Sequence, residues 1–563
     1  MIKRIFVLLV FVCGLLASIT PAIAQDSKTV TLLHMSDYHS HAVPFYSEGQ
    51  NNSAGLARTI AYLRPFAQNP SALVFSGGDT LNLGTPAWSD KYRCVEWSMF
   101  NDIIDAMAYG NHEADYGPDT FAQCRTQIKY PILSANTVDA NGQPLFANNG
   151  KNYAVFETNG VKIGVFAVAG SDFERLVRPA LRPFAGAVFA DRIAAARTVV
   201  QALREQEQVN AVVLIGHSLR EDDIALAQAV PEIDIIFGSH SHRKEELFVI
   251  PGTTTHMISS FQYLTYISKL DLTFTDGKLN RINGGLVRMS SDLPEDPQIA
   301  QMVAQMQRDL EADPQFAPLF QPIGQAASEL STDNQFVQDA SLGNFVMDIF
   351  RATAGSHMAV STASSFREPL APGVIQEEDL RTSLPYKNKV LVYDLTGAQI
   401  QELLNYSVSR TGSDFFSQVS GVRFNVVNKE ATSVQILKDP ANPAAGYAAL
   451  DPAATYAVAT TDFQGKIAAG YKDIFAKATA ERDTGIADVR DNIRAFIQAN
   501  SPIQAVVDGR IMVGAATAPA APQAPATIPA ALPSTGGVPF APLAAMLFGG
   551  GLIVAGLLIR RQA

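Results

Sequence analysis

The stretch Asp105-Ala-Met-Ala-Tyr-Gly-Asn-His-Glu113 joins a short apolar run to a turn of glycine and polar side chains. The apolar run has the length of a buried strand, and the glycine lets the backbone approach its neighbours closely where the strand ends. The same order recurs from residue 29 to about 290, where apolar runs end in small polar clusters and helical stretches follow. Such alternation of strand and helix predicts a layered α/β domain.

Outward from this stretch, the pattern predicts two regions of regular structure. The predicted strands of the first are Thr29–His34, Ala72–Ser76, Asp105–Tyr109, Pro131–Ser134, Lys162–Val168, Ala211–Ile215 and Ile233–Phe237, and its predicted helices are 55–67, 91–103, 189–207 and 221–229. A helix at 296–312 leads into a connector. The predicted strands of the second are Lys389–Leu395, Val422–Val427 and Tyr456–Thr460, and its predicted helices are 338–353, 397–409 and 486–499. The second region, 331–513, is large enough to be a domain.

Polar clusters with Asp, Asn or His follow five of the predicted strands. The clusters are Asp37-Tyr-His39, Gly77-Gly-Asp79, Gly110-Asn-His-Glu113, Gly216-His217 and Gly238-Ser-His-Ser-His242. Loops at the carboxyl ends of strands in α/β sheets converge on one crevice. Asp, His and Asn side chains that meet there suit divalent transition metals. A lone histidine at a strand end is usually an ordinary polar residue, but five such clusters together indicate a metal site.

The order D-x-H, G-D, G-N-H-E, G-H, G-H-x-H resembles the metallophosphoesterase family. Further details, His34-x-x-Asp37-x-His39 and Ser134-Ala-Asn136 among them, are similar to the secreted two-domain 5′-nucleotidases, whose relatives act on 2′,3′-cyclic nucleotides and UDP-sugars. The resemblance covers about 29–510. It implies an α/β fold: a four-layered metallophosphoesterase sandwich, followed by a separate α/β 5′-nucleotidase C-terminal domain.

We accordingly expect a fixed order of parts along the chain. The expected parts are a signal peptide (1–24), a catalytic domain (25–295), a connector helix and hinge (296–330), a substrate-binding domain (331–513), an Ala/Pro-rich tether (514–531) and a sorting signal or membrane anchor (532–563).

The resemblance also implies two divalent metal ions, and it does not distinguish zinc, manganese, iron or cobalt. Their implied ligands are Asp37, His39, Asp79 and His242 for the first ion and Asn111, His217 and His240 for the second, with Asp79 bridging. A hydroxide between the ions would attack phosphorus. Two divalent ions, two aspartates and that hydroxide leave about one positive charge for holding a phosphate.

His112 and Asp115 resemble the catalytic pair of the family. His112 would stabilise the transferring phosphoryl group or protonate the leaving oxygen, and Asp115 would orient its ring. Asp115 is also a candidate helix N-cap, and the two roles are compatible.

The second region resembles the family domain in which two aromatic rings sandwich the base. The implied substrate-binding residues are Arg367, Asn388, Phe463 and Phe416, the last with Phe415 as a neighbouring alternative. Core packing is the alternative role for each phenylalanine. Two departures weaken the match: Thr362-Ala-Ser-Ser-Phe-Arg367 retains only the arginine of the family motif, and Ala469 replaces the aspartate that holds the ribose.

The chain ends indicate export. Residues 1–24 have a basic start, a short apolar run and an Ala-x-Ala site, which is typical of a signal peptide, with an anchor helix as the alternative. Leu532-Pro-Ser-Thr-Gly536, an apolar run at 538–559 and two arginines resemble an LPxTG-type sorting signal for a sortase, which implies attachment to the cell wall. A plain membrane anchor is the alternative. Cys94 and Cys124 either pair or remain as two thiols.

The net charge of −11 includes four basic residues in these two ends, Lys3, Arg4, Arg560 and Arg561, and no acids there, so the body carries about −15. Such a body offers no basic footprint for nucleic acid. The sequence thus predicts an extracellular, surface-anchored phosphohydrolase for nucleotides. The alternatives are the same chemistry on another organic phosphate or phosphodiester, and a surface protein that only binds.

Overall fold

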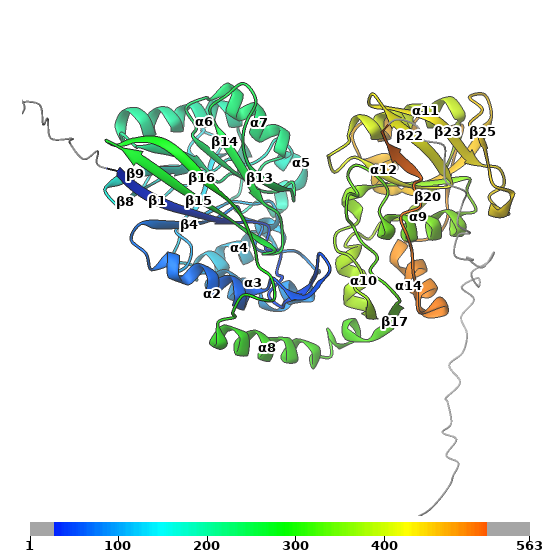
Figure 1. Ribbon diagram of the computed structural model, residues 1–563, viewed down its shortest axis with the longest axis horizontal. Helices are drawn as coiled ribbons and strands as arrows, with labels where there is room; N and C mark the ends of the chain where they lie inside the picture. Colours follow the sequence, from blue (N-terminus) through cyan, green and yellow to red (C-terminus); the bar gives the residue numbers. More distant parts are fainter. Residues whose placement is uncertain (1–26, 515–563) are drawn as a thin grey trace, which may run out of the picture.

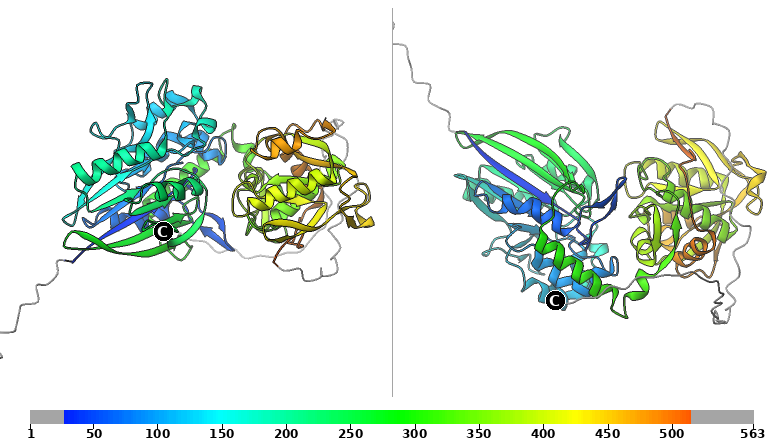
Figure 2. Two further views of the ribbon diagram at one scale, coloured as in Figure 1. Left: turned by 90° about the horizontal axis from the view of Figure 1, so that it is seen from above. Right: turned by 60° about the horizontal axis from the view of Figure 1, so that its bottom comes forward.

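The computed structural model describes residues 27–514. The predicted signal peptide, nearly all of the tether and the sorting signal lie outside this range. Figure 1 shows two lobes side by side, joined below by helix α8 (Pro297–Glu311). Figure 2 shows the same two lobes from above and from below.

Two β-sheets stack face to face in the first lobe. One has the order β10 (Val188–Phe189), β6 (Ile132–Val138), β5 (Ala106–Ala108), β4 (Ala72–Ser76), β1 (Ser27–Met35), β15 (Tyr266–Thr275) and β16 (Lys278–Arg288), with β7 (Pro144–Phe146) paired to β6. The other has the order β13 (Lys244–Val249), β14 (His256–Ser260), β12 (Ile235–Gly238), β11 (Ala211–Leu214), β9 (Val161–Phe166) and β8 (Ala154–Thr158). Strands β1, β4, β5 and β6 are parallel, as are β9, β11, β12 and β14.

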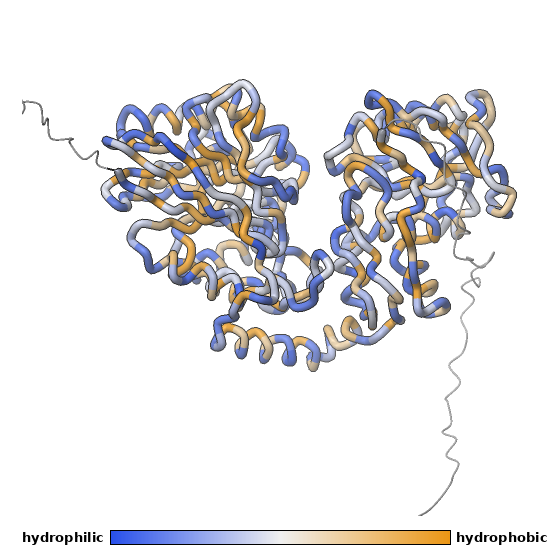
Figure 3. Tube along the Cα trace, in the orientation of Figure 1, coloured by the Kyte–Doolittle hydropathy of each residue, from blue (hydrophilic) through white to orange (hydrophobic). Residues whose placement is uncertain are grey.

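Apolar side chains fill the space between these sheets. Leu32, Phe75, Ile163, Val213 and Phe237 belong to this inner core, and none of them has exposed surface. Apolar positions lie mainly inside the lobes in Figure 3. Because both faces of the central strands β4, β11 and β12 are covered, these strands read as continuous apolar runs.

Helices cover the two outer faces. Helices α2 (Leu56–Ala67), α3 (Ala87–Met99) and α4 (Gly117–Arg125) pack on the first sheet, and α6 (Arg192–Gln201) and α7 (Arg220–Ala229) pack on the second. The result is the expected four-layered sandwich. Cys94 of α3 and Cys124 of α4 form a disulfide.

The second lobe is a separate α/β structure. Its main sheet has the order β21 (Ser417–Ser420), β18 (Met358–Thr362), β25 (Thr455–Thr461), β20 (Val390–Thr396) and β26 (Ala480–Asp483), and a smaller sheet has the order β24 (Tyr447–Ala449), β23 (Glu430–Leu437), β22 (Val422–Val427) and β27 (Ile511–Val513). A further pair joins β17 (Pro322–Ala326) to β19 (Gly373–Gln376). Its helices include α9 (Ser341–Ala354), α10 (Glu377–Ser383), α11 (Gly397–Ser409), α12 (Asp462–Lys466), α13 (Tyr471–Phe475) and α14 (Val489–Asn500).

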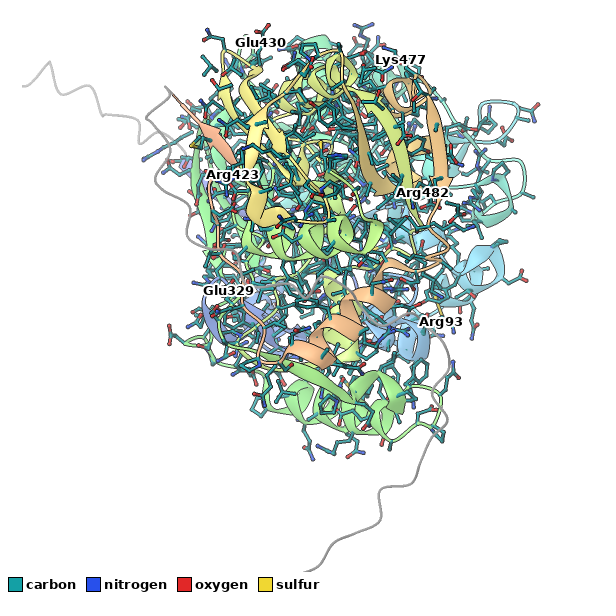
Figure 4. All side chains as sticks on the ribbon, turned by 90° about the vertical axis from the view of Figure 1, so that its right-hand side faces the viewer. Arg93, Glu329, Arg423, Glu430, Lys477 and Arg482 are labelled. Carbon is teal, nitrogen blue, oxygen red and sulfur yellow. A yellow bond between two sulfur atoms is a disulfide. The ribbon has the colours of Figure 1, made fainter. Side chains whose placement is uncertain are left out.

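A hairpin of the first lobe reaches the second. It consists of β2 (Phe45–Ser47) and β3 (Gln50–Ser53), and the hydroxyl of Tyr46 donates to Glu329 at 2.8 Å. Figure 4, which looks onto the second lobe with the first behind it, labels Glu329. Within residues 27–514, no helix combines the length and apolarity needed to cross a bilayer.

Candidate metal centre and catalytic pair

The first group of metal-ligating side chains joins loops from both sheets of the first lobe. Asp37 and His39 follow β1, and His242 follows β12. The Nε2 atom of His242 lies 3.3 Å from Oδ1 of Asp37 and 3.1 Å from Nε2 of His39. All three side chains are buried. Three donors that converge at such distances form a candidate cation site.

The second group lies beside the first and consists of Asp79, His217 and His240. Oδ2 of Asp79 lies 3.1 Å from Nε2 of His217 and 3.6 Å from Nε2 of His39. Asp79 therefore stands between the two groups, in the position that a bridging carboxylate requires. It is fully buried, and the histidines His217, His112 and His39 hold the pKa of its carboxyl far below the ordinary value despite the opposing effect of burial.

The hydrogen bonds of His217 and His39 fit binding of divalent ions through Nε2. Nδ1 of His217 lies 2.7 Å from the carbonyl of Gly77, and Nδ1 of His39 lies 3.0 Å from the carbonyl of Leu81. A ring that donates through Nδ1 keeps a lone pair on Nε2 for a metal. Oδ1 of Asn111 is buried with no hydrogen-bond partner among the described residues, which also fits an oxygen that ligates a metal.

Glu113 connects the loop of Asp79 to the turn of Gly110 by hydrogen bonds, a role that the sequence did not predict. Its carboxyl accepts hydrogen bonds from the backbone N–H groups of Asp79, Thr80 and Gly110 at 2.9, 2.6 and 2.7 Å. A Cβ on Gly110 would collide with the carboxylate of Asp79. The glycine of the Gly-Asn-His-Glu turn is therefore required by the close approach of these two loops.

His112 and Asp115 form the expected pair. Nδ1 of His112 lies 2.7 Å from Oδ2 of Asp115, and that same oxygen accepts the backbone N–H of Leu83 at 2.8 Å. Helix α4 begins after Tyr116 without a side-chain cap, so Asp115 serves the histidine rather than the helix. Burial lowers the pKa of His112, but Asp115 and Asp79 outweigh it and raise the pKa to about 10.

The second lobe contributes side chains to the same site. Arg367 donates from Nη1 to Nδ1 of His242 at 2.7 Å and from Nη2 to the hydroxyl of Tyr386 at 2.6 Å. Nε2 of His41 lies 2.5 Å from Oε1 of Glu368. A cavity of about 40 Å³ between the lobes is lined by residues of both, including His39, His112, His242, Arg367, Glu368 and Tyr386.

The other expected substrate residues lie apart from the metal groups. Asn388 lines a second, smaller cavity of the second lobe, together with Tyr386 and Phe366. Phe463 is half-buried on α12. Phe416 has no exposed surface and packs in the core of the lobe, so in this arrangement it presents no face to a base. The neighbouring Phe415 is partly exposed.

Comparison with known proteins agrees with this architecture. The family model described as calcineurin-like phosphoesterase matches residues 30–244, and the one described as 5′-nucleotidase, C-terminal domain, matches residues 322–477. The fold and site define a metal-dependent phosphoester hydrolase. The chain belongs to the metallophosphoesterases that carry a 5′-nucleotidase C-terminal domain.

Several curated relatives span both lobes. Protein UshA of Escherichia coli is 24% identical, with 87% of this chain and 95% of that protein covered. A 5′-nucleotidase of Vibrio cholerae is 25% identical, with 85% and 92% covered. The trifunctional nucleotide phosphoesterase YfkN of Bacillus subtilis is 24% identical over 86% of this chain, which spans only 35% of that longer protein.

Solved structures share the fold. A 5′-nucleotidase precursor from Thermus thermophilus has a TM-score of 0.69 at 24% identity and covers 87% of this chain and 100% of its own. A sulfate thiohydrolase, SoxB, from Thermus thermophilus reaches 0.67 at 18% identity, with 87% and 97% covered. Because proteins with these two different names share one architecture, the fold alone does not define a substrate.

Proposed function

We propose that this protein hydrolyses phosphate esters of nucleotides at a two-metal centre. The observation that carries the proposal is the position of Asp79 between two groups of ligands. Asp37, His39 and His242 would hold one ion with Asp79, and Asn111, His217 and His240 would hold the other. Two bound divalent ions would clamp phosphoryl oxygens and lower the pKa of a water between them.

The protein's own residues would complete the chemistry. With Nδ1 bonded to Asp115, His112 has Nε2 available to donate a proton to the leaving oxygen or a hydrogen bond to the phosphoryl group. Arg367 lines the cavity and would add its positive charge to that of the bound ions. This local charge allows a body of about −15 to hold a phosphate dianion.

A second candidate is hydrolysis of small organic phosphates. Two features favour it: Phe416 offers no exposed face for stacking, and Ala469 supplies no carboxylate for a ribose hydroxyl. Losing the acceptor of a buried hydroxyl costs about 1–3 kcal/mol. A nucleoside would therefore gain less from this second lobe than from one with a complete pocket.

Hydrolysis followed by chromatography of the products tests both candidates, because a cyclic nucleotide or a UDP-sugar can be cleaved without releasing phosphate. The purified protein, loaded with manganese or zinc, is given AMP, a 2′,3′-cyclic nucleotide, a UDP-sugar and glycerol phosphate at matched concentrations. Preference for the nucleotides supports the first candidate. Equal or faster release from glycerol phosphate supports the second. No hydrolysis of any substrate by protein with two bound ions contradicts both and favours a role in binding alone.

We further propose that the protein is exported and tethered at the cell surface. The disulfide between Cys94 and Cys124 supports an oxidising compartment. The supporting terminal segments, 1–24 and 532–563, lie outside the described residues. Mass spectrometry of the protein from cell-wall, membrane and soluble fractions tests this proposal: a C-terminus at Thr535 in the cell wall supports sortase attachment, an intact C-terminus in the membrane supports the plain anchor, and protein found only inside the cell contradicts the proposal.

A further inference from the structure

Glu96 is a buried carboxyl group that has no role in the proposed chemistry. It lies on α3 and has no exposed surface. Oε1 accepts the hydroxyl of Tyr38 at 2.9 Å, and Oε2 accepts the hydroxyl of Ser40 at 2.7 Å. These two residues flank His39. A carboxyl group loses several kcal/mol of hydration when it is buried, whereas an apolar side chain would fill the same space without that cost.

The loop that Glu96 contacts has an unfavourable backbone conformation. Asp37, His39 and Ser40 have φ angles of 50°, 46° and 60°, which fall in the left-handed region. Such a conformation costs a non-glycine residue roughly 1–2 kcal/mol. It persists only where surrounding contacts hold it. The conformation matters because this loop carries two of the proposed ligands, Asp37 and His39.

Contacts on two sides hold the loop. On one side, the backbone N–H groups of Asp37, His39 and Ser40 donate to the carbonyls of Gly78, Asp79 and Thr80 at 3.0–3.1 Å. These bonds align the loop with the loop of the bridging aspartate. On the other side, the carboxyl group of Glu96 fixes the side chains of Tyr38 and Ser40.

Helix α3 is itself held in place. Cys94, two residues before Glu96, is bonded to Cys124 of α4, and Trp97, the residue after Glu96, is fully buried. Helix α4 follows directly on the turn that carries Asn111 and His112. The carboxyl group of Glu96 on α3 therefore has a defined position relative to that turn as well as to the loop of Asp37 and His39.

We infer that Glu96 is a positioning residue that holds the loop of Asp37 and His39 in its metal-binding conformation through the hydroxyls of Tyr38 and Ser40. It belongs to none of the candidate metal groups and does not line the cavity between the lobes. The inference rests on the metal assignment of the proposed function. Partners that orient metal ligands typically contribute about 10–100-fold to metal affinity, and this range sets the expected effect.

The test measures Mn²⁺ binding by calorimetry and thermal unfolding, both on the chelator-stripped full protein. Glu96→Leu removes both acceptors and keeps the volume. We expect it to weaken the Kd for Mn²⁺ by about 10–100-fold. The double variant Tyr38→Phe, Ser40→Ala removes the same two hydrogen bonds from the other side and should weaken the Kd similarly. Adding Glu96→Leu to that background should change the Kd by less than about twofold, because the shared contacts are already gone.

Two further variants keep the test decisive. Glu96→Gln retains one oxygen acceptor and should bind Mn²⁺ more tightly than Glu96→Leu, and it replaces that variant if the leucine protein does not fold. Asp105→Asn is the matched control. Asp105 is a carboxyl group at the opposite end of β5 that accepts the backbone N–H of Val74 at 2.7 Å, so its variant should change Tm without changing the Kd.

The outcomes distinguish failure of the positioning role from failure of the metal assignment on which it rests. Glu96→Leu with a lowered Tm and a Kd within twofold of wild type overturns the positioning role and leaves a purely structural one. Full additivity with Tyr38→Phe, Ser40→Ala also overturns it. Wild-type protein that binds no Mn²⁺ overturns the metal assignment itself, and the inference with it.

Discussion

Arg367 of the second lobe donates a hydrogen bond of 2.7 Å to Nδ1 of His242 in the first. The other ring nitrogen of His242 faces Asp37 and His39, at 3.3 and 3.1 Å. One imidazole therefore connects the candidate metal centre to the second lobe. The cavity between the lobes is lined by both of them, so it depends on this arrangement.

Arg367→Ala should lower kcat/KM by roughly 10–100-fold, because a charged hydrogen bond to a buried group contributes about 1.5–3 kcal/mol. Elemental analysis of the same samples separates this loss from a loss of metal, because Arg367 also donates to the candidate ligand His242. Arg367→Lys keeps the charge but loses the planar fork, and we expect only partial recovery. Steady-state kinetics on the best substrate of the panel measures both. Activity of the alanine variant within twofold of wild type would exclude a role in phosphate binding.

His112→Ala should reduce kcat by about 10²–10⁴-fold, the usual contribution of a positioned acid or base. Asp115→Asn should cause a smaller loss, because the ring remains but loses the carboxylate 2.7 Å from Nδ1. Turnover under saturating substrate gives these values, and elemental analysis of the same samples controls for metal loss. If His112→Ala turns over normally, the residue has no catalytic role.

Asp79→Ala should impair binding of both ions, whereas His217→Ala should impair mainly one. The reason is the position of Asp79 between the two ligand groups, since His217 contacts only the second. Metal-to-protein ratios after equilibration at a fixed low Mn²⁺ concentration report the difference. Equal loss in both variants would argue against a bridging position.

The double variant Cys94→Ser, Cys124→Ser should unfold at a lower temperature. A disulfide that closes a loop of 30 residues stabilises by about 3–4 kcal/mol. At roughly 2–4 °C per kcal/mol, Tm should fall by about 6–16 °C. Reductant should lower the Tm of wild type to that of the variant and leave the variant unchanged. A wild type that does not respond to reductant would mean that the thiols are unpaired.

The stability of the protein should fall with rising pH partly because of Glu96. Burial raises the pKa of Glu96 to about 8, against the opposing hydrogen bonds of Ser40 and Tyr38, from an ordinary value of 4.5. Between pH 4.5 and 8 the folded state therefore keeps a proton that the unfolded state releases. The contribution of Glu96 to the free energy of unfolding is fully present below pH 4.5 and is lost as the pH rises through 8.

Glu96→Gln removes this titration. Differential scanning calorimetry of chelated protein at pH 6 and 9 should give a smaller fall in Tm for Glu96→Gln than for wild type. Burial also raises the pKa of Glu378, to about 7, so part of the pH dependence should remain in the variant. Identical falls in the two proteins would show that Glu96 does not titrate in this range.

Short-range patterns in the sequence sufficed for the layered α/β class and for the turns that carry the candidate ligands. A strand of apolar residues followed by glycine and a polar cluster is a local signal, and Asp79, Asn111 and His217 each follow a strand. The predicted ends of helices and strands agreed less well with the structure. The helix predicted at 91–103 spans Ala87–Met99 and begins directly after Pro86, its N-cap residue.

Tertiary packing decided what local patterns do not encode. Phe415 and Phe416 are adjacent and chemically identical, and only the packing of the second lobe buries one and leaves the other partly exposed. Glu96 reaches Tyr38 across 58 residues, and Arg367 reaches His242 across 125. Such contacts depend on how whole elements stack, because the free energy that holds them comes from burying surface between layers and lobes rather than from the residues adjacent in the chain.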